Sequence, residues 1–181
     1  MIKPASVISC FRKIFHMKRV SNYLPLTSPY GYGWAGTNIN NLSDNLKAAG
    51  VAFGKLREGL KFDAIAFTGS SGAAIAFYLG IEHKIPLIYV RKKNEDSHGY
   101  PVEGTTDAGI IKKYLIVDDF VQSGATVNRI ITEIKEYAVS RFAYPAEPVG
   151  VFCFEPYGCQ RSRHVNLDGI DIPIFMAKDI N

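Results

Sequence analysis

Cysteine is scarce in this sequence of 181 residues, which contains Cys10, Cys153 and Cys159 and no CxxC pair. No pair of histidines at metal-ligand spacing lies near them, so neither a zinc site nor a disulfide framework is expected. Cys153 falls in an apolar run and is predicted to pack in the core rather than act as a nucleophile. A reducing, cytoplasmic location is the simplest expectation.

Long hydrophobic runs are missing as well. Basic residues interrupt every apolar run between positions 1 and 20, so no signal peptide is expected, and no later stretch has the length of a membrane span. Repeats and low-complexity linkers are lacking, which predicts one domain over residues 1–181. The net charge of +4 suits a small anionic ligand but is too diffuse to argue by itself for nucleic acid, which is not expected as a partner.

The most informative stretch that is present runs from position 114 to 127. An apolar run at 114–117 ends in Asp118 and Asp119, and the small-residue loop 122–126 follows. Apolar residues then recur at helical spacing, which predicts a helix that starts at or just before Thr126: Val127, Ile130, Ile131 and Ile134. Ordinary strand ends and helix caps could produce each feature alone, but their coincidence favours a binding site.

This order of elements has a chemical meaning. Backbone N–H groups of the loop and first helical turn, together with the helix dipole, form an anion site, to which Ser123 and Thr126 can add hydroxyl donors. Carboxylates do not hold a phosphate directly, but Asp118 and Asp119 can accept hydrogen bonds from hydroxyls or lie near a phosphate-bound cation. The stretch therefore predicts a site for a sugar phosphate that carries a divalent metal.

A second unit of the same kind precedes it. The apolar strand 64–67 leads into the polar loop 68–72, and a helix over 73–79 is predicted to end at Gly80. An amphipathic helix over 42–60, with Asn41 or Ser43 as N-cap, and further strands at 85–90, 148–154 and 170–174 complete the pattern. Pro173 predicts that the last strand lies at a sheet edge. The alternation indicates an α/β fold: a parallel sheet flanked by helices, with the polar loops at the carboxyl ends of its strands.

A long charged loop at 91–101 connects two of these units. It has no hydrophobic periodicity and starts with Arg91, Lys92 and Lys93. As an isolated charge run it would be a solvated connection, but its place between two predicted phosphate sites favours a lid over a polyanion.

Residues 115–126 resemble the phosphoribosyl pyrophosphate (PRPP) signature of the type I phosphoribosyltransferases, with Gln122 at a position that is usually small. The charged loop, with His98-Gly99, and Ser28-Pro29-Tyr30 resemble the flexible loop and an N-terminal segment of orotate phosphoribosyltransferases. Two features differ: Glu95, Asp96 and Ser97 replace the family's loop lysine, and the Lys-Ser-Gly that precedes the Ser-Pro-Tyr segment is absent.

The resemblance implies the type I phosphoribosyltransferase fold, with a small hood from about 1–40, a core at about 41–155 and a C-terminal strand and loop at 156–181. It implies transfer of 5-phosphoribosyl from PRPP to a pyrimidine such as orotate, or to a purine, in nucleotide synthesis or salvage. A homodimer is expected, and Mg²⁺ is expected to be held mainly by PRPP and water near Asp118 and Asp119. A PRPP-binding regulatory or non-catalytic module is the alternative.

The resemblance also assigns expected roles to residues. Asp118 and Asp119 would hold the ribose hydroxyls, and the 5-phosphate would lie against Gln122, Ser123, Gly124, Ala125 and Thr126. The pyrophosphate would lie against Thr68, Gly69, Ser70 and Ser71, with Arg91, Lys92, Lys93 and His98 closing over it. The aromatic residues of segment 1–36 are either a base-stacking surface or a satellite core, so the acceptor base stays open.

Overall fold

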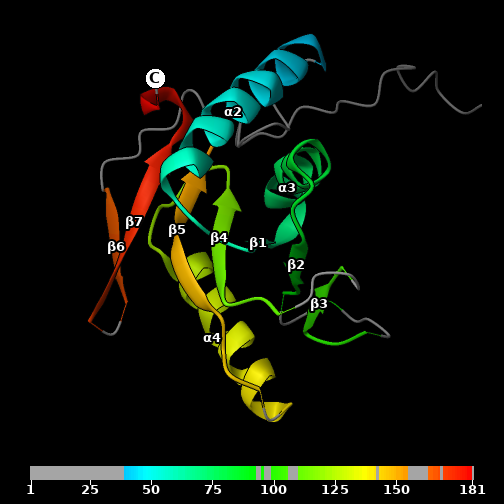
Figure 1. Ribbon diagram of the computed structural model, residues 1–181, viewed down its shortest axis with the longest axis vertical. Helices are drawn as coiled ribbons and strands as arrows, with labels where there is room; N and C mark the ends of the chain where they lie inside the picture. Colours follow the sequence, from blue (N-terminus) through cyan, green and yellow to red (C-terminus); the bar gives the residue numbers. More distant parts are fainter. Residues whose placement is uncertain are drawn as a thin grey trace, which may run out of the picture.

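One mixed sheet forms the centre of the computed structural model, which describes residues 39–92, 95, 99–105, 110–141, 143–154, 163–167 and 169–180. The strands are β1 Ala64–Phe67, β2 Leu87–Val90, β3 Val102–Gly104, β4 Lys113–Asp118, β5 Glu147–Cys153, β6 His164–Leu167 and β7 Ile170–Met176. The helices are α2 Ile39–Gly59, α3 Gly69–His83 and α4 Ala125–Ser140, with the 3₁₀ turn η2 Ala177–Asp179 (Figure 1). The predictions for the segment before position 39, and for Lys93, His98 and Cys159, fall outside the described residues.

The strand order is β3-β2-β1-β4-β5-β7-β6, and the five central strands are parallel. This confirms the predicted α/β class. The two outer strands, β3 and β6, pair antiparallel with their neighbours and were not predicted. They contain three and four residues, which is too short for a pattern of alternation to stand out.

Alternation along the central strands supplies two cores, one on each face of the sheet. Ala64, Ala66 and Ile116 face α4, whereas Ile65 and Leu115 face α2 and α3. Helix α4 therefore covers one face and the pair α2 and α3 covers the other (Figure 1). The reversal of helix side occurs between β1 and β4, which is where ligands bind in open α/β sheets.

The boundaries of two helices differ from the predictions. Helix α2 begins at Ile39, so the predicted N-caps Asn41 and Ser43 lie inside it. Helix α3 begins at Gly69, so most of the predicted loop 68–72 forms its first turn. Gly80 does not end α3, because the helix continues to His83 and is capped by Lys84 in the left-handed conformation. A Cβ at Gly80 would lie 2.8 Å from Leu87 Cδ2, so this glycine permits close packing of α3 on β2.

Pro173 does not mark a sheet edge, which corrects the prediction for the last strand. Strand β7 pairs antiparallel with β6 through Pro173 and parallel with β5 from Ile174 onward. Proline lacks a backbone donor, and here it stands where β7 changes from one partner to the other. The neighbouring strand β6 is held to β7 by a side-chain contact as well, since His164 Nδ1 lies 2.8 Å from Asp171 Oδ2 on β7.

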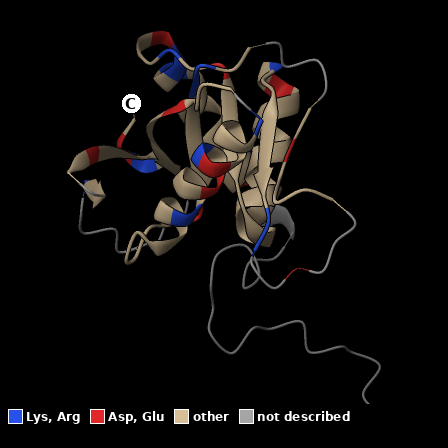
Figure 2. Cartoon of the chain, turned by 90° about the horizontal axis from the view of Figure 1, so that it is seen from below, with Lys and Arg blue, Asp and Glu red and all other residues tan. Residues whose placement is uncertain are grey.

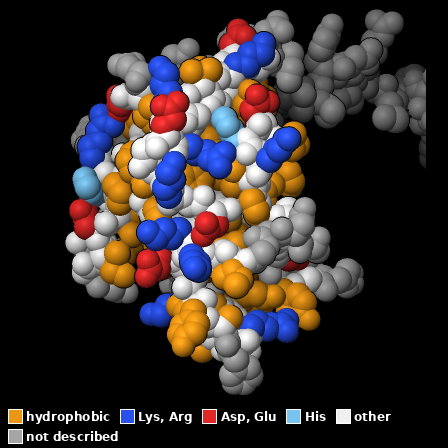
Figure 3. Space-filling view, viewed as in Figure 1, with side chains coloured by type: hydrophobic (Ala, Val, Ile, Leu, Met, Phe, Trp, Pro, Cys, Tyr) orange, Lys and Arg blue, Asp and Glu red, His pale blue; other side chains and the backbone are white. Residues whose placement is uncertain are grey.

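On the face seen in Figure 3, acidic side chains lie among the basic ones, and the coloured cartoon shows acidic and basic positions on the same elements (Figure 2). In the part of the chain that the structure describes, no helix combines the length and the apolar character needed to cross a bilayer.

Candidate functional site

A pocket of about 240 Å³ opens where β1 and β4 end side by side. It lies at the point of helix reversal, so loops from both faces of the sheet contribute to it. We call it the carboxylate pocket, and its lining residues are Thr68, Gly69, Ser71, Lys92, Asp118, Asp119, Phe120, Val121, Gln122, Ser123, Gly124, Ala125, Thr126, Val127 and Arg129.

The two adjacent carboxylates form the floor of this pocket. Asp118 and Asp119 are each only 7% exposed. Asp118 Oδ1 accepts hydrogen bonds from Asp119 N at 3.0 Å and from Ser71 Oγ at 3.4 Å, and Asp119 Oδ1 accepts one from Phe120 N at 2.9 Å. Burial, and then the charge of Asp119, raises the pKa of Asp118 to about 7. A cation or a hydroxyl-rich ligand would relieve this unfavourable pair.

The loop after the carboxylates turns directly into helix α4. Gly124 has φ +77, and a Cβ at this position would lie 2.7 Å from Val165 Cγ1, so both backbone conformation and space require glycine. The first turn is fixed by Ala125 N donating to Ser123 Oγ at 3.4 Å and by Asn128 N donating to Gly124 O at 2.8 Å. The start of a long helix thus faces the pocket, which suits an anion.

The end of β1 supplies the opposite wall. Thr68 is 5% exposed and occupies the N-cap position of α3, but its side chain makes no capping hydrogen bond. Its Oγ1 instead accepts a hydrogen bond from Arg129 Nη2 at 2.8 Å. Gly69 has φ +63, and a Cβ there would lie 3.2 Å from Lys92 Nζ, so the lysine side chain passes closely over this glycine. Lys92 therefore brings a positive charge to the pocket.

Most of the residues predicted for the site come together in the carboxylate pocket. They are Thr68, Gly69, Ser71, Lys92, Asp118, Asp119, Gln122, Ser123, Gly124, Ala125 and Thr126. Ser70 lines a neighbouring groove instead, and Arg91 lines neither cavity. Arg129 was missed; its only signal in the sequence was a cation one turn beyond the predicted phosphate-binding loop.

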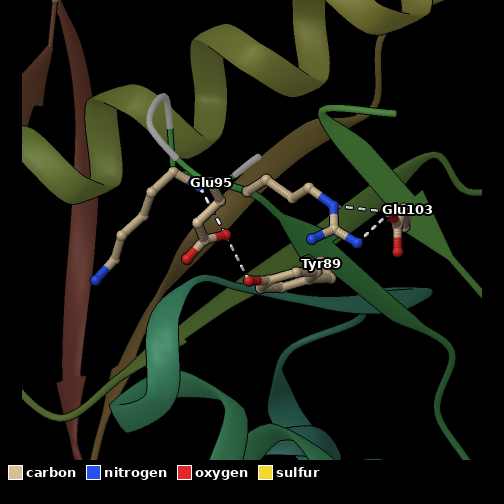
Figure 4. A network of polar contacts seen from close by, with 5 residues as sticks. Tyr89, Glu95 and Glu103 are labelled. Atoms are coloured by element: carbon tan, nitrogen blue, oxygen red, sulfur yellow. Dashed lines mark hydrogen bonds and ion pairs between the residues drawn. The ribbon is translucent and has the colours of Figure 1, made fainter. Parts of the chain in front are cut away.

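Arg91 is held at the base of the charged loop 91–101 by an acidic partner. Its Nη2 lies 2.6 Å and its Nε 2.8 Å from Glu103 Oε1, and its guanidinium lies 5.3 Å from the centre of the Tyr89 ring. The Tyr89 hydroxyl donates to Glu95 Oε2 at 2.8 Å, and Lys92 N donates to the same oxygen at 3.2 Å (Figure 4). Arg91 thus contributes to the order of the loop base, and its contact with a substrate stays a prediction.

The far end of the charged loop is attached to helix α4. The Arg141 guanidinium lies 4.6 Å from the centre of the Tyr100 ring and 5.4 Å from that of Tyr137, and the two rings are 6.2 Å apart. This stacking fixes the residues just before β3.

A larger and more apolar cavity, about 530 Å³, adjoins the carboxylate pocket at Gly69. We call it the aromatic groove. Its lining residues are Phe67, Gly69, Ser70, Ala73, Phe77, Leu87, Tyr89, Glu95, Glu103, Gly104 and Thr105.

The sequence is similar to known proteins over most of its length. It is 30% identical over 150 residues to an orotate phosphoribosyltransferase of Pyrococcus abyssi, an alignment that covers 79% of this chain and 78% of that protein. The chain belongs to the type I phosphoribosyltransferase family. This membership assigns it to the pentosyltransferases of nucleotide metabolism. No family model matches the sequence.

Further comparisons agree with the place of this phosphoribosyltransferase in the family. It is 31% identical over 121 residues to the orotate phosphoribosyltransferase of Pyrococcus horikoshii, covering 64% of this chain and 60% of that protein. The adenine phosphoribosyltransferase of Saccharomyces cerevisiae, solved with adenine and an imino sugar bisphosphate, has the same fold with a TM-score of 0.53. That structure is 17% identical, and the match covers 77% of this chain and 80% of the yeast chain.

Proposed function

We propose that this phosphoribosyltransferase transfers 5-phosphoribosyl from PRPP to a nitrogenous base and releases pyrophosphate. The observation that carries the proposal is the carboxylate pocket, in which two strand–loop–helix units surround a buried pair of carboxylates. Orotate is the first acceptor to test, because the relatives in Pyrococcus are orotate phosphoribosyltransferases.

In the proposed reaction the bond from ribose C1 to the pyrophosphate oxygen breaks and the oxygen keeps the electron pair. A bond from C1 to a nitrogen of the base forms, and that nitrogen releases its proton to water. Ribose C1 carries positive charge between the two events, so positioning and charge stabilisation are the main tasks of the protein. The loop 122–126 binds the 5-phosphate, and Asp118 and Asp119 bind the ribose hydroxyls next to the developing charge. Thr68, Gly69 and Lys92 receive the pyrophosphate.

Magnesium fits the chemistry of this pocket. Proteins usually bind Mg²⁺ through one or two carboxylates together with substrate phosphates and water, and the pocket offers Asp118 and Asp119. No group of three potential metal-binding side chains comes together within the described residues. We propose that Asp118 and Asp119 lie near an ion that is held mainly by PRPP and water, and that neutralises the charge of the departing pyrophosphate.

We also propose that the enzyme acts as a homodimer. Helix α3 exposes Phe77 and Ile81, which are 54% and 76% accessible, and Phe77 also lines the aromatic groove. A second copy of the chain would cover this apolar face.

A PRPP-binding regulator is the second candidate. It is favoured by Glu95, which lies in the stretch where the family has its loop lysine. The Glu95 carboxylate accepts hydrogen bonds from the Tyr89 hydroxyl and from Lys92 N. The two candidates differ in turnover: a regulator binds PRPP tightly and releases no pyrophosphate with any base.

Incubation with PRPP, Mg²⁺ and a panel of bases, with release of pyrophosphate as the readout, tests the proposal. The wild type is expected to turn over, and Asp118→Asn combined with Asp119→Asn is expected to abolish turnover while the circular dichroism spectrum stays native. Asp44→Asn, on the exposed side of α2, serves as a control for the loss of a carboxylate. Full activity of the double variant would show that the pocket is assigned wrongly. Removal of Mg²⁺ with EDTA should stop turnover reversibly.

A further inference from the structure

Arg129 joins three elements that are far apart in the sequence. It lies in the second turn of α4, and its Nη1 donates to the backbone oxygen of Arg91 at 2.6 Å while its Nη2 donates to Thr68 Oγ1 at 2.8 Å. These contacts connect α4 with the residues that directly follow β2 and β1. The same side chain lines the carboxylate pocket.

Each of the two contacts controls a group that faces the pocket. The oxygen of Arg91 belongs to the peptide bond that leads into Lys92, so fixing it fixes the origin of the Lys92 side chain that passes over Gly69. The Thr68 hydroxyl has one proton and can accept as well as donate. Because Arg129 donates to it, the Thr68 oxygen acts as acceptor toward Arg129 and its proton is directed to another acceptor. An anionic oxygen in the pocket is the chemically matched acceptor.

The planar guanidinium suits this task. Its N–H groups have a fixed geometry, so two acceptors from different strands can be held at once at a set separation. A lysine has a single nitrogen on a flexible chain and holds such a pair less well.

We propose that Arg129 is a positioning residue that presents Thr68 as a hydrogen-bond donor and Lys92 as a cation to the diphosphate end of the substrate. This inference rests on the proposed phosphoribosyl transfer and names a residue that determines how the pyrophosphate end is bound. Arg129 acts on the pyrophosphate side of the pocket and not on the loop 122–126. It should therefore strengthen binding of the pyrophosphate group of PRPP and leave binding of the ribose 5-phosphate group unchanged.

Calorimetric titration of the full chain with PRPP, inorganic pyrophosphate and ribose 5-phosphate, each with Mg²⁺, tests this. Arg129→Ala should weaken binding of PRPP and pyrophosphate by about tenfold to a hundredfold, the effect of losing hydrogen bonds from a charged donor. Binding of ribose 5-phosphate should stay as in the wild type. Arg129→Lys should recover part of the loss, and Lys135→Ala, an exposed cation on the same helix, should bind all three compounds normally.

A double-mutant cycle with Thr68→Val sharpens the test. If Arg129 acts partly through the Thr68 hydroxyl, the double variant loses less affinity for pyrophosphate than the sum of the single losses. Thr68→Val and Arg129→Lys also keep the test available if Arg129→Ala does not fold.

The outcomes separate two kinds of failure. Wild-type affinity for PRPP in Arg129→Ala, or an equal loss for PRPP and ribose 5-phosphate, would overturn the positioning role and leave the proposed function standing. A wild-type protein that binds neither PRPP nor pyrophosphate would overturn the proposed function and this inference together.

Discussion

The carboxylates Asp118 and Asp119 lie where they lower the stability of the folded state and can contact a ligand. Both are buried next to one another, and the Asp118 carboxylate accepts hydrogen bonds from the backbone N–H of Asp119 and the hydroxyl of Ser71. Charges in such a place are costly without a partner. Their presence directly after the buried apolar run 114–117 therefore marks a site where function, rather than stability, determines the residue.

Replacement of Asp118 by Asn should stabilise the ligand-free protein in a pH-dependent way. The pKa of Asp118 rises from 3.8 to about 7 on folding. The folded state therefore holds a proton that the unfolded chain has released, and wild-type stability falls as the pH rises between these values. We expect Asp118→Asn to be more stable than the wild type by about 1–3 kcal/mol at pH 8, with no gain near pH 4. Urea unfolding across this range measures the difference.

Asp63 provides the opposite control. Backbone hydrogen bonds from Lys113 and Lys112 lower the pKa of Asp63, so its stabilising effect is present at neutral pH and is lost as the pH falls. Asp63→Asn should thus be less stable than the wild type at pH 8. A gain for Asp118→Asn that did not vary with pH would contradict the assigned role of burial.

At the residue scale, the sequence predicted the pocket residues that stand in polar loops after apolar strands, and it missed Arg129, which stands inside a helix. The pocket residues between positions 118 and 126 lie in one stretch of recognisable chemistry. Arg129 acts through partners that are 38 and 61 positions away, and only the sheet topology brings these together.

At the scale of elements, the close approach of α3 to β2 depends on Gly80. A Cβ at this position would lie 2.8 Å from Leu87 Cδ2 and 3.3 Å from the oxygen of Ile85. Gly80→Ala should therefore destabilise the protein by about 1–2 kcal/mol, because the buried Leu87 must shift. Gly54→Ala, in the interior of α2, is the matched control, since its Cβ would lie 3.5 Å from His83 Cε1. We expect it to be neutral or to gain up to about 1 kcal/mol from helix propensity. Thermal unfolding of both variants compares them.

Buried central strands were predictable because both faces are apolar, and β1 has the bounds expected from its sequence. The start of α3 was not, since Gly69, Ser70 and Ser71 are poor helix formers that tertiary packing overrides. Tertiary packing also explains why the prediction for Gly80 was wrong. A glycine near a helix end predicts a cap, but here the close contact with Leu87 of β2 requires the glycine.

At the scale of the whole molecule, the exposed apolar face of α3 predicts self-association. Sedimentation equilibrium should show a dimer of the wild type at micromolar concentration. Combining Phe77→Ser with Ile81→Ser should weaken the dimer by about tenfold or more, because each side chain loses apolar burial. Val139→Ser, which removes a 62% exposed side chain from α4 on the other face of the sheet, should leave it unchanged. A monomeric wild type would show the dimer proposal to be wrong.

Helix α4 and its C-cap residue Arg141 hold both ends of the charged loop 91–101, through Arg129 at Arg91 and through Tyr137 and Arg141 at Tyr100. Both attachment points belong to the fold, because Arg91 directly follows β2 and Tyr100 precedes β3. We therefore expect insertions, deletions and charge reversals between these anchors to be tolerated as long as the anchors are retained. The Glu95-Asp96-Ser97 sequence in place of the family's lysine is a change of this kind, and loop exchange between relatives with the anchors retained offers a route to altered substrate handling.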